Sequence, residues 1–470
     1  MGNRREEKER ARAADGLGQL SESIHFEAVS QNAIHAAKRL ILDCIGCMVG
    51  GSQLPQGRRM TDFFTAIPEE GESTLIHNRK KIRSIHAGYV NAYLANLLDF
   101  DDTYFGHPGA TVIPPALALS EKLNLSGREL LAAVVAGYEV GMRVADAIKP
   151  SGRRLRKVMG VSTWQVFSSV AASGKVLALN REQMVHAISL AAINAPVPSV
   201  RKLGLENREI HWMKNNYGWA AMGGMLAAMM AQQGFKGDRT VFDGPKGFWI
   251  MAGSDRYRPN LMNKGLKGKW AVERVSIKPY SACRHIHPTL DALFSLISEG
   301  GFSVDTIRHI DVTTFFEVVE NYNFFPQEPF TIPFSAPYLV ALSLLGVPTG
   351  LQWFEGEHLS NPRVRDLADR VRFHHWPEAD VLYAKVKREL ISRVAIETKD
   401  GRRFEKEVRL PKGDPRNPIT DEELQGKFFT LVSPVLGQAQ AADIYTEILN
   451  LERIENCAIL ARRLAGSGGN

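Results

Sequence analysis

The chain has 470 residues, a length that predicts about two or three domains. Its 44% hydrophobic and 23% charged residues are typical of a soluble globular protein. The formal charge of +7 is modest for this length, and no basic run is interleaved with aromatic residues, so a nucleic-acid partner is disfavoured. The positive charge suits an anionic small-molecule substrate. The 4 cysteines are too few for a disulfide scaffold and favour a reducing, cytoplasmic location.

The N-terminal stretch 1–17 is predicted to be a disordered leader, because it is dense in Arg, Lys and Glu and has no apolar core. It lacks the pattern of a secretory signal, and its glutamates are atypical of a transit peptide. Longer apolar stretches such as 219–230 are interrupted by Gly and bounded by Gln, so no membrane span is expected.

Helical periodicity dominates the next part of the chain and predicts an all-helical domain over 18–274. Capping boxes begin at Ser126 and at Asn180, each ahead of an apolar helical pattern. The predicted helices around 170–179 and 220–231 are rich in Ala, Gly and Ser, which lets neighbouring helices approach closely.

The pattern changes near Lys278, and residues 275–415 are predicted to form a smaller α+β domain. Asp400-Gly401 is typical of a hairpin turn between two strands. The predicted elements are strands beginning at Ile310, over 386–398 and over 404–410, and helices over 287–298 and 336–345.

Residues 416–465 return to a helical pattern, which starts with a capping box at Thr420. These helices are predicted to rejoin the first domain. The expected fold class is therefore mainly α: a large all-helical domain, made of the N-terminal part and the C-terminal helices, with the smaller α+β domain inserted.

A turn at 97–109 collects side chains suited to proton transfer. A helical pattern leads into it, and Gly106, Pro108 and Gly109 force the backbone out of helix. Its polar residues are Asp99, Asp101, Asp102, Thr103 and His107. Asp and Thr also cap helices, and a His-Pro-Gly turn can be purely structural, so both explanations stay open. At least one of the carboxylates is expected to cap a helix.

Other candidate residues lie further along the chain. Lys214 follows an apolar pair and can hold a substrate carboxylate or be a solvated charge at a helix start. Tyr338 opens a helix in the second domain, where its hydroxyl needs a structural or a substrate partner. The basic run 153–157 is interpreted as a solvated loop face, and the steering of anions toward the site is the alternative. Cys44 and Cys47 form a C-x-x-C inside an apolar run and are interpreted as core residues.

The segment 278–288 concentrates a lysine, a thiol, an arginine and two histidines at the predicted domain junction. A metal is one explanation for His285 and His287. No H-x-x-x-H or H-E-x-x-H pattern accompanies them, so no metal site is predicted.

Taken together, these stretches resemble the MmgE/PrpD family, which includes 2-methylcitrate dehydratase, cis-aconitate decarboxylase and iminodisuccinate epimerase. The similarity extends in the same order over about 40–430. The motifs that carry it are Leu-Asp-Phe-Asp-Asp-Thr and His-Pro-Gly within 98–109, 125–140, Trp-Met-Lys at 212–214, Gly-Phe-Lys-Gly at 234–237, 242–248, Lys-Pro-Tyr-Ser-Ala-Cys-Arg-His at 278–285, Phe-Ser-Ala-Pro-Tyr at 334–338 and Asn-Pro-Ile-Thr at 417–420.

The resemblance implies a homodimer in which the α+β domain forms a lid over an active site in the cleft between domains. It implies no metal, iron–sulfur cluster or organic cofactor. The catalytic positions carried over by motif are Asp99, Thr103, His107, Lys214, Lys278 and Tyr338. The predicted substrate-binding residues are Arg201, Cys283, Arg284 and His285.

Two departures leave the substrate open. Decarboxylase-type members have a Gly-Phe-His-Pro motif where this chain reads Val-Met-Gly-Val-Ser-Thr-Trp at 158–164. Some members also carry histidine at the position of Cys283.

The leading hypothesis is a 2-methylcitrate dehydratase-like hydro-lyase that acts on a hydroxy-polycarboxylate through proton transfer next to a carboxylate. In it, Lys214 and Lys278 neutralise charge, and His107 or Asp99 is the base. The alternatives are an epimerase of an iminodisuccinate-like substrate, a cis-aconitate-type decarboxylase, or a protein that only binds an acidic metabolite.

Overall fold

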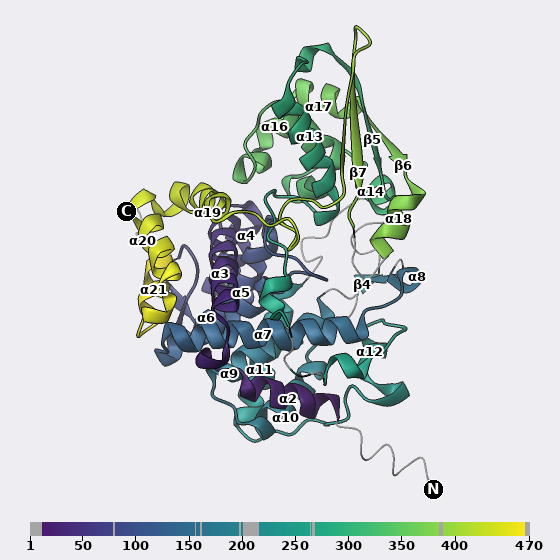
Figure 1. Ribbon diagram of the computed structural model, residues 1–470. Helices are drawn as coiled ribbons and strands as arrows, with labels where there is room; N and C mark the ends of the chain where they lie inside the picture. The colour runs from purple at the N-terminus through teal and green to yellow at the C-terminus, as the bar shows by residue number, and fades with distance from the viewer. Residues whose placement is uncertain are drawn as a thin grey trace.

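The computed structural model describes residues 12–78, 80–155, 157–159, 162–196, 199–200, 216–263, 265, 268–384 and 389–465. A body of helices carries a smaller α/β unit on one side, and the C-terminal helices flank the body (Figure 1). The mainly α fold class predicted from the sequence is confirmed.

The helices of the N-terminal part lie in close succession. They are α2 (Ala13–Ser23), α3 (Gln31–Gly51), α4 (Pro55–Thr65), α5 (Ser84–Leu97), α6 (Gly109–Leu123), α7 (Gly127–Ile148), α8 (Gly152–Leu155), α9 (Val166–Val176), α10 (Arg181–Ile193), α11 (Tyr217–Gln232) and α12 (Phe248–Met251). Two short antiparallel pairs accompany them, β1 (Ser73–Thr74) with β2 (Lys81–Ile82) and β3 (Val158–Met159) with β4 (Ser199–Val200).

The capping boxes read from the sequence form at the starts of three helices. Ser126 caps α7, Asn180 caps α10 and Thr420 caps α19 (Asp421–Leu436), and both reciprocal hydrogen bonds are present in each case. Each box satisfies backbone N–H groups that the first turn of a helix otherwise leaves unpaired.

Small residues bring the central helices into close contact, as predicted. A Cβ added at Gly141 of α7 would lie 1.7 Å from Ser168 Oγ of α9, and one at Gly224 of α11 would lie 2.4 Å from Ser169 Cβ. Interior packing leaves no room for either atom, so the helix crossings depend on these glycines.

Helix α2 begins inside the stretch predicted to be a leader. Ala13 and Leu17 are buried, and α2 packs on α10. Arg239 Nε donates to Asp15 Oδ1 at 3.0 Å, which ties the helix to the body. The prediction of disorder is therefore wrong for 13–17, because tertiary burial stabilises a helix that local composition did not predict. Residues 1–11 lie outside the described part.

The α/β unit contains a four-stranded sheet in the order β6-β5-β7-β8. Only β5 and β6 are parallel, and the hairpin of β7 and β8 turns at Asp400-Gly401 as predicted, where Gly401 has φ +86°. The elements are α13 (His287–Glu299), β5 (Ile307–Thr314), α14 (Phe316–Asn321), α15 (Ala336–Leu344), α16 (Gly356–Ser360), α17 (Pro362–Asp369), β6 (Val371–His375), α18 (Pro377–Ala384), β7 (Ser392–Thr398) and β8 (Arg403–Val408).

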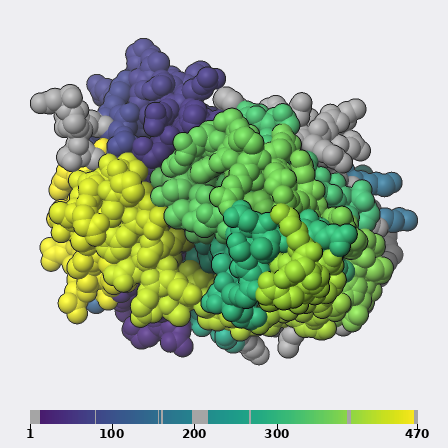
Figure 2. All heavy atoms as spheres, turned by 90° about the horizontal axis from the view of Figure 1, so that it is seen from above, coloured from purple at the N-terminus to yellow at the C-terminus, as the bar shows by residue number. Residues whose placement is uncertain are grey.

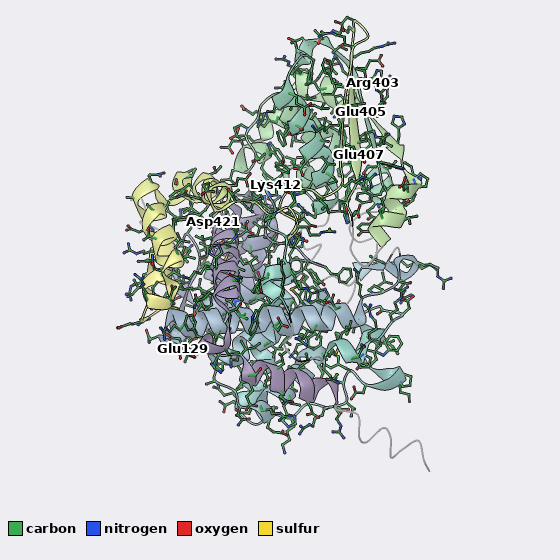
Figure 3. The ribbon with its side chains drawn as sticks, in the orientation of Figure 1. Glu129, Arg403, Glu405, Glu407, Lys412 and Asp421 are labelled. Carbon is green, nitrogen blue, oxygen red and sulfur yellow. The ribbon has the colours of Figure 1, made fainter. Side chains whose placement is uncertain are left out.

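The sheet has one covered and one polar face. Ile310 and Val312 of β5 are fully buried, and α13 packs against β7 and β8. On β8, alternate charged side chains such as Arg403, Glu405 and Glu407 lie along the strand (Figure 3). This alternation is what a half-buried antiparallel strand requires.

The chain then returns to the helical body. Helices α19, α20 (Gln438–Leu449) and α21 (Ala458–Leu464) pack on α3 and α6. Seen from above, they lie beside the α/β unit (Figure 2). Lys412 joins the two regions, because its Nζ lies 3.0 Å from Glu423 Oε2 in the first turn of α19.

Candidate active site

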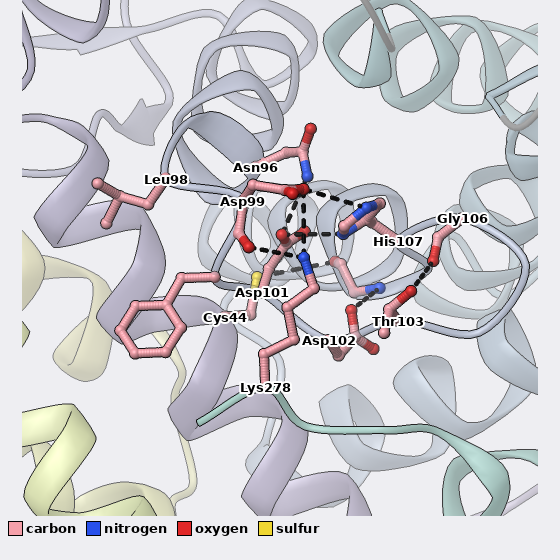
Figure 4. A network of polar contacts seen from close by, with 12 residues as sticks. Cys44, Asn96, Leu98, Asp99, Asp101, Asp102, Thr103, Gly106, His107 and Lys278 are labelled. Atoms are coloured by element: carbon pink, nitrogen blue, oxygen red, sulfur yellow. Dashed lines mark hydrogen bonds and ion pairs between the residues drawn. The ribbon is translucent and has the colours of Figure 1, made fainter. Parts of the chain in front are cut away.

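The turn between α5 and α6 adopts a conformation that gathers its polar side chains. Asp99 has φ +48°, in the left-handed region that a non-glycine residue seldom adopts. Strain of this kind persists where the surrounding structure fixes it and is common at functional sites. Here the turn points Asp99, Asp101 and His107 toward one another and toward Lys278 (Figure 4).

Asp101 holds the His107 ring at its Nδ1 nitrogen. Nδ1 lies 3.0 Å from Asp101 Oδ1, and the same oxygen accepts a 2.9 Å hydrogen bond from Asn96 Nδ2. Asp101 is fully buried. A buried carboxylate on Nδ1 fixes the orientation of an imidazole.

The backbone of His107 is fixed as well. Its N–H donates to Gln165 Oε1 at 2.8 Å, and Gln165 Nε2 donates to the His107 carbonyl at 2.7 Å. Gln165 lies in a short 3-10 turn, Thr163–Gln165, and is fully buried. Hydrogen bonds to the ring and to the main chain of His107 therefore both hold the imidazole in position.

Asp99 lies between the imidazole and a buried lysine. Its Oδ1 is 3.4 Å from His107 Nε2 and 3.2 Å from Lys278 Nζ. The ammonium also donates to the Asp99 carbonyl at 2.6 Å, and only 1% of the Lys278 side chain is exposed. A base, a carboxylate and a cation thus share one buried location, which is what proton transfer with charge stabilisation requires.

Asp102 has a structural role, as expected for one carboxylate of the turn. Its Oδ1 accepts from the backbone N–H of Gly109, the first residue of α6, at 2.9 Å, and Tyr138 donates to its Oδ2 at 2.6 Å. Burial raises the pKa of Asp102 well above its usual range, and the neighbouring Asp101 carboxylate adds to the rise.

Thr103 helps to join the turn to the segment that carries Lys278. Its backbone exchanges two hydrogen bonds with Ser276, and Ser281 Oγ donates to the Leu98 carbonyl at 2.6 Å. The Thr103 hydroxyl donates to the Gly106 carbonyl at 3.0 Å, within the turn. The structure therefore brings the backbone of Thr103 to the site but does not direct its hydroxyl at the Asp99–His107–Lys278 cluster.

Cys283 and His285 lie next to each other after Lys278. The Cys283 Sγ is 3.9 Å from His285 Nδ1, and His285 Nε2 is 3.1 Å from the Tyr383 hydroxyl. Burial raises the pKa of the Cys283 thiol, with the Asp99 carboxylate adding to the rise, so the neutral thiol is favoured. Their substrate-binding role stays a prediction.

Arg284 points to a different part of the chain. Its Nη1 and Nη2 donate to the carbonyls of Lys412 and Pro411 at 2.6 and 3.1 Å, and Nη1 lies 3.3 Å from His287 Nδ1. Burial lowers its pKa to about 10. The structure thus gives Arg284 a part in holding the loop after β8 and does not bring it to the cluster.

Tyr338 is fully buried in α15. Its ring meets Phe325 edge to face at 5.3 Å, and its hydroxyl has no hydrogen-bond partner among the described residues. Burial raises the pKa of this phenol, so the neutral, protonated form is favoured. Lys214 and Arg201, predicted to be catalytic and substrate-binding, lie outside the described residues.

The sequence did not single out several residues that build the site. Asp101 was one of three equivalent carboxylates, and spacing could not show which one meets Nδ1. Asn96 and Gln165 are amides with no chemical motif. Lys427 of α19 is buried and donates to the Phe100 and Lys278 carbonyls at 2.6 and 2.9 Å. Its position among the apolar residues of an amphipathic helix was the one available signal.

Three side chains of the site could also approach a metal ion. Ligand atoms of Asp99, Asp101 and His107 lie within 4.8 Å of one another. The Lys278 ammonium already contacts Asp99 at 3.2 Å, and its charge would repel a divalent cation there. His285 and His287 belong to no such cluster among the described residues.

Comparison with known proteins gives the family. The MmgE/PrpD N-terminal domain matches residues 16–258, and the MmgE/PrpD C-terminal domain matches residues 280–453. The chain belongs to the MmgE/PrpD family, as the resemblance indicated. Lys278 lies between the two matched ranges.

Curated relatives match along nearly the whole chain. A cis-aconitate decarboxylase-like protein, oryM, of Aspergillus oryzae is 27% identical, covering 93% of this chain and 94% of its own length. The cis-aconitate decarboxylase of Mus musculus is 26% identical, covering 93% of this chain and 90% of its own. That of Aspergillus terreus is 24% identical, covering 95% and 96%. In the described part of the chain, no helix combines the length and apolarity needed to cross a membrane.

Proposed function

We propose that this protein is a lyase that acts on a small hydroxy-polycarboxylate, as a hydro-lyase of the 2-methylcitrate dehydratase type. The observation that carries the proposal is the contact of Asp99 Oδ1 with both His107 Nε2 and Lys278 Nζ, at 3.4 and 3.2 Å. Family membership and the names of the relatives support a lyase.

In the proposed reaction, a proton leaves the carbon next to a substrate carboxylate. His107 Nε2 accepts it while Nδ1–H donates to Asp101, or Asp99 accepts it directly. The pair of electrons left on carbon delocalises into the carboxylate, and the Lys278 ammonium stabilises the charge that develops there. Loss of hydroxide from the adjacent carbon then forms the alkene, and a protonated group returns the proton so that water leaves.

Tyr338 is the proposed proton donor for the leaving hydroxyl. Its phenol is buried, and its hydroxyl has no partner among the described residues. Lys214 and Arg201 are proposed to bind substrate carboxylates, as the family motifs indicate.

A decarboxylase is the second candidate, and the relatives' names favour it. Loss of CO₂ also leaves an electron pair next to a carboxylate, so the same lysine and imidazole serve that reaction. An epimerase would return the proton to the opposite face of the same carbon. A protein that only binds an acidic metabolite would not need the imidazole to be held at both its ring and its backbone.

The test follows purified protein by proton NMR in D₂O with citrate, 2-methylcitrate, cis-aconitate and iminodisuccinate in turn. New alkene signals from a hydroxy acid support the hydro-lyase, whereas conversion of cis-aconitate with release of CO₂ supports the decarboxylase. Deuterium exchange without net product supports the epimerase. His107→Ala should abolish each signal, and Asp102→Asn, which changes a capping carboxylate of the same turn, should retain it. Binding without exchange for any of the four would refute the catalytic proposal.

We also propose that the protein is a homodimer. Helices α4, α5 and α11 form an open hollow of about 490 Å³ lined by Met60, Phe63, Phe64, Tyr89, Tyr93 and Trp219, among others. Phe63 and Trp219 are 66% and 43% exposed, and such aromatic patches favour a partner surface. Light scattering after gel filtration should give twice the 52.2 kDa chain mass, and Phe63→Glu should lower it toward one chain.

A further inference from the structure

Lys427 connects three separated parts of the chain beneath the cluster. It lies on α19, with 5% of its side chain exposed, and its Nζ contacts Asp43 Oδ1 of α3 at 2.5 Å. The same nitrogen donates to the Phe100 carbonyl at 2.6 Å and to the Lys278 carbonyl at 2.9 Å. All three donors of the ammonium are therefore in use.

The two carbonyls belong to the two backbone segments that carry the reactive side chains. Phe100 lies between Asp99 and Asp101, and the second carbonyl is that of Lys278 itself. The ammonium also lies 3.9 Å from the centre of the Phe100 ring, a cation–π contact. One buried charge thus holds both segments whose side chains meet at Asp99 Oδ1.

The two segments are also joined at Asp99 itself, where the Lys278 ammonium donates to the carbonyl at 2.6 Å, and by two further links. Ser281 Oγ reaches the Leu98 carbonyl at 2.6 Å, and the backbones of Thr103 and Ser276 pair further along. Lys427 adds a contact from the C-terminal helix α19, and its hydrogen bond to the Phe100 carbonyl lies one peptide beyond Asp99, the residue with the left-handed backbone.

We propose that Lys427, with its counter-ion Asp43, is a positioning unit for the active site: it fixes the backbone of Phe100 and Lys278 so that the Lys278 ammonium stays against Asp99. The inference rests on the proposed function for its catalytic consequence. It gives the C-terminal helix α19 a part in positioning the reactive groups.

The pair also sets the charge around the site. A charge buried without water is screened weakly, so removal of either partner acts on the neighbouring acid–base groups. The titratable groups around Lys427 are Asp43 and Cys47 from α3, Asp101 from the turn, Lys278 from the junction and His287 from α13. Burial raises the pKa of the Cys47 thiol and lowers that of His287, so these two favour their neutral forms.

The opposite charges of the pair distinguish positioning from simple stabilisation. Lys427→Met removes a cation, so the acidic midpoint of the kcat/KM–pH profile should move to higher pH. Asp43→Asn removes an anion but keeps an acceptor oxygen, so the same midpoint should move to lower pH. A residue that only stabilises the fold would shift both variants in one direction or neither.

The control is a second buried lysine that joins α3 to the C-terminal helices. Lys38 Nζ donates to the Leu449 carbonyl at 2.7 Å and pairs with Glu452, and neither partner belongs to the described part of the site. Lys38→Met therefore removes a comparable buried contact between α3 and the C-terminal helices. It should leave kcat within about twofold of wild type, whereas Lys427→Met should lower kcat at least about 10-fold with little change in KM.

Hydrogen exchange tests the positioning without any substrate. In Lys427→Met, peptides covering 98–105 and 274–283 should exchange at least about 10-fold faster, and in Lys38→Met they should not. If wild type turns over none of the four substrates, the proposed function fails while this exchange result still decides the positioning. If Lys427→Met does not fold, Asp43→Asn gives the pH shift alone. Any of three results would overturn the inference: hydrogen exchange at the wild-type rate in Lys427→Met, an equal loss of kcat in Lys38→Met, or pH midpoints of Lys427→Met and Asp43→Asn that move in the same direction.

Discussion

Asp101→Asn should separate the orientation of His107 from the rest of the site. The substitution is nearly isosteric and keeps an oxygen for Asn96, which now donates to Asp101 Oδ1 at 2.9 Å. It removes the negative charge 3.0 Å from His107 Nδ1. A neutral amide oxygen then replaces the carboxylate at Nδ1 and accepts less strongly from the ring N–H, so the orientation of His107 is less well fixed.

A positioned acid–base group contributes about 10² to 10⁴ in rate. Since tenfold corresponds to about 1.4 kcal/mol, Asp101→Asn should raise the activation free energy by about 3 to 6 kcal/mol. The measurement is kcat from initial rates, with deuterium exchange into the substrate as the readout of the proton step. KM should change little, because Asp101 is fully buried behind the imidazole.

Asp102→Asn is the matched control, one residue away and equally buried. Its oxygens serve Gly109 and Tyr138, so activity should stay within about threefold of wild type. Because the folded state raises the pKa of Asp102, the folded protein holds this proton more tightly than the unfolded chain. Stability from this group therefore falls as pH rises above the ordinary carboxyl range, and the variant escapes that loss. Equal loss of turnover in the two variants would refute the assignment of Asp101.

Three further substitutions test other parts of the site and its support. Lys278→Met should lower kcat by about 10² to 10³, because it removes the cation that stabilises developing charge, while circular dichroism checks the fold. Tyr338→Phe removes a hydroxyl without a described partner, so dehydration should slow at least about 10-fold while the melting temperature stays within a few degrees; equal rates would exclude Tyr338 as the proton donor. His287→Gln tests the pH dependence of stability. Burial, together with the Arg284 charge, lowers the pKa of His287 in the folded protein. Below about pH 6.5 the unfolded chain therefore binds a proton at His287 that the folded protein does not bind. Wild type should then lose up to about 1.4 kcal/mol of stability per pH unit below 6.5 in urea titrations, and the variant should lose less; parallel curves would contradict this.

Local signals in the sequence were enough for the helices and their ends. The capping boxes at Ser126, Asn180 and Thr420 and the hairpin at Asp400 depend on residues within four positions of one another, so each could be recognised directly. The family motifs likewise named Asp99, His107 and Lys278, which the structure brings together. The disorder predicted from composition was wrong at the start of α2, because this helix is stabilised by packing against α10. No local sequence pattern indicates that contact.

What the sequence by itself determined was the mainly α class, the family and the chemical types at the site. It could not assign roles to three aspartates within four positions, because a turn directs each side chain by its backbone angles and not by its spacing. Only the tertiary structure decided that Asp101 holds the imidazole, that Asp102 caps α6 and that Asp99 meets Lys278. It also showed Lys427 beneath the cluster, 149 residues along the chain from Lys278. A hydrogen bond forms only when donor and acceptor lie about 3 Å apart in space. The number of residues between two positions, when it is as large as 149, does not indicate whether they approach that closely.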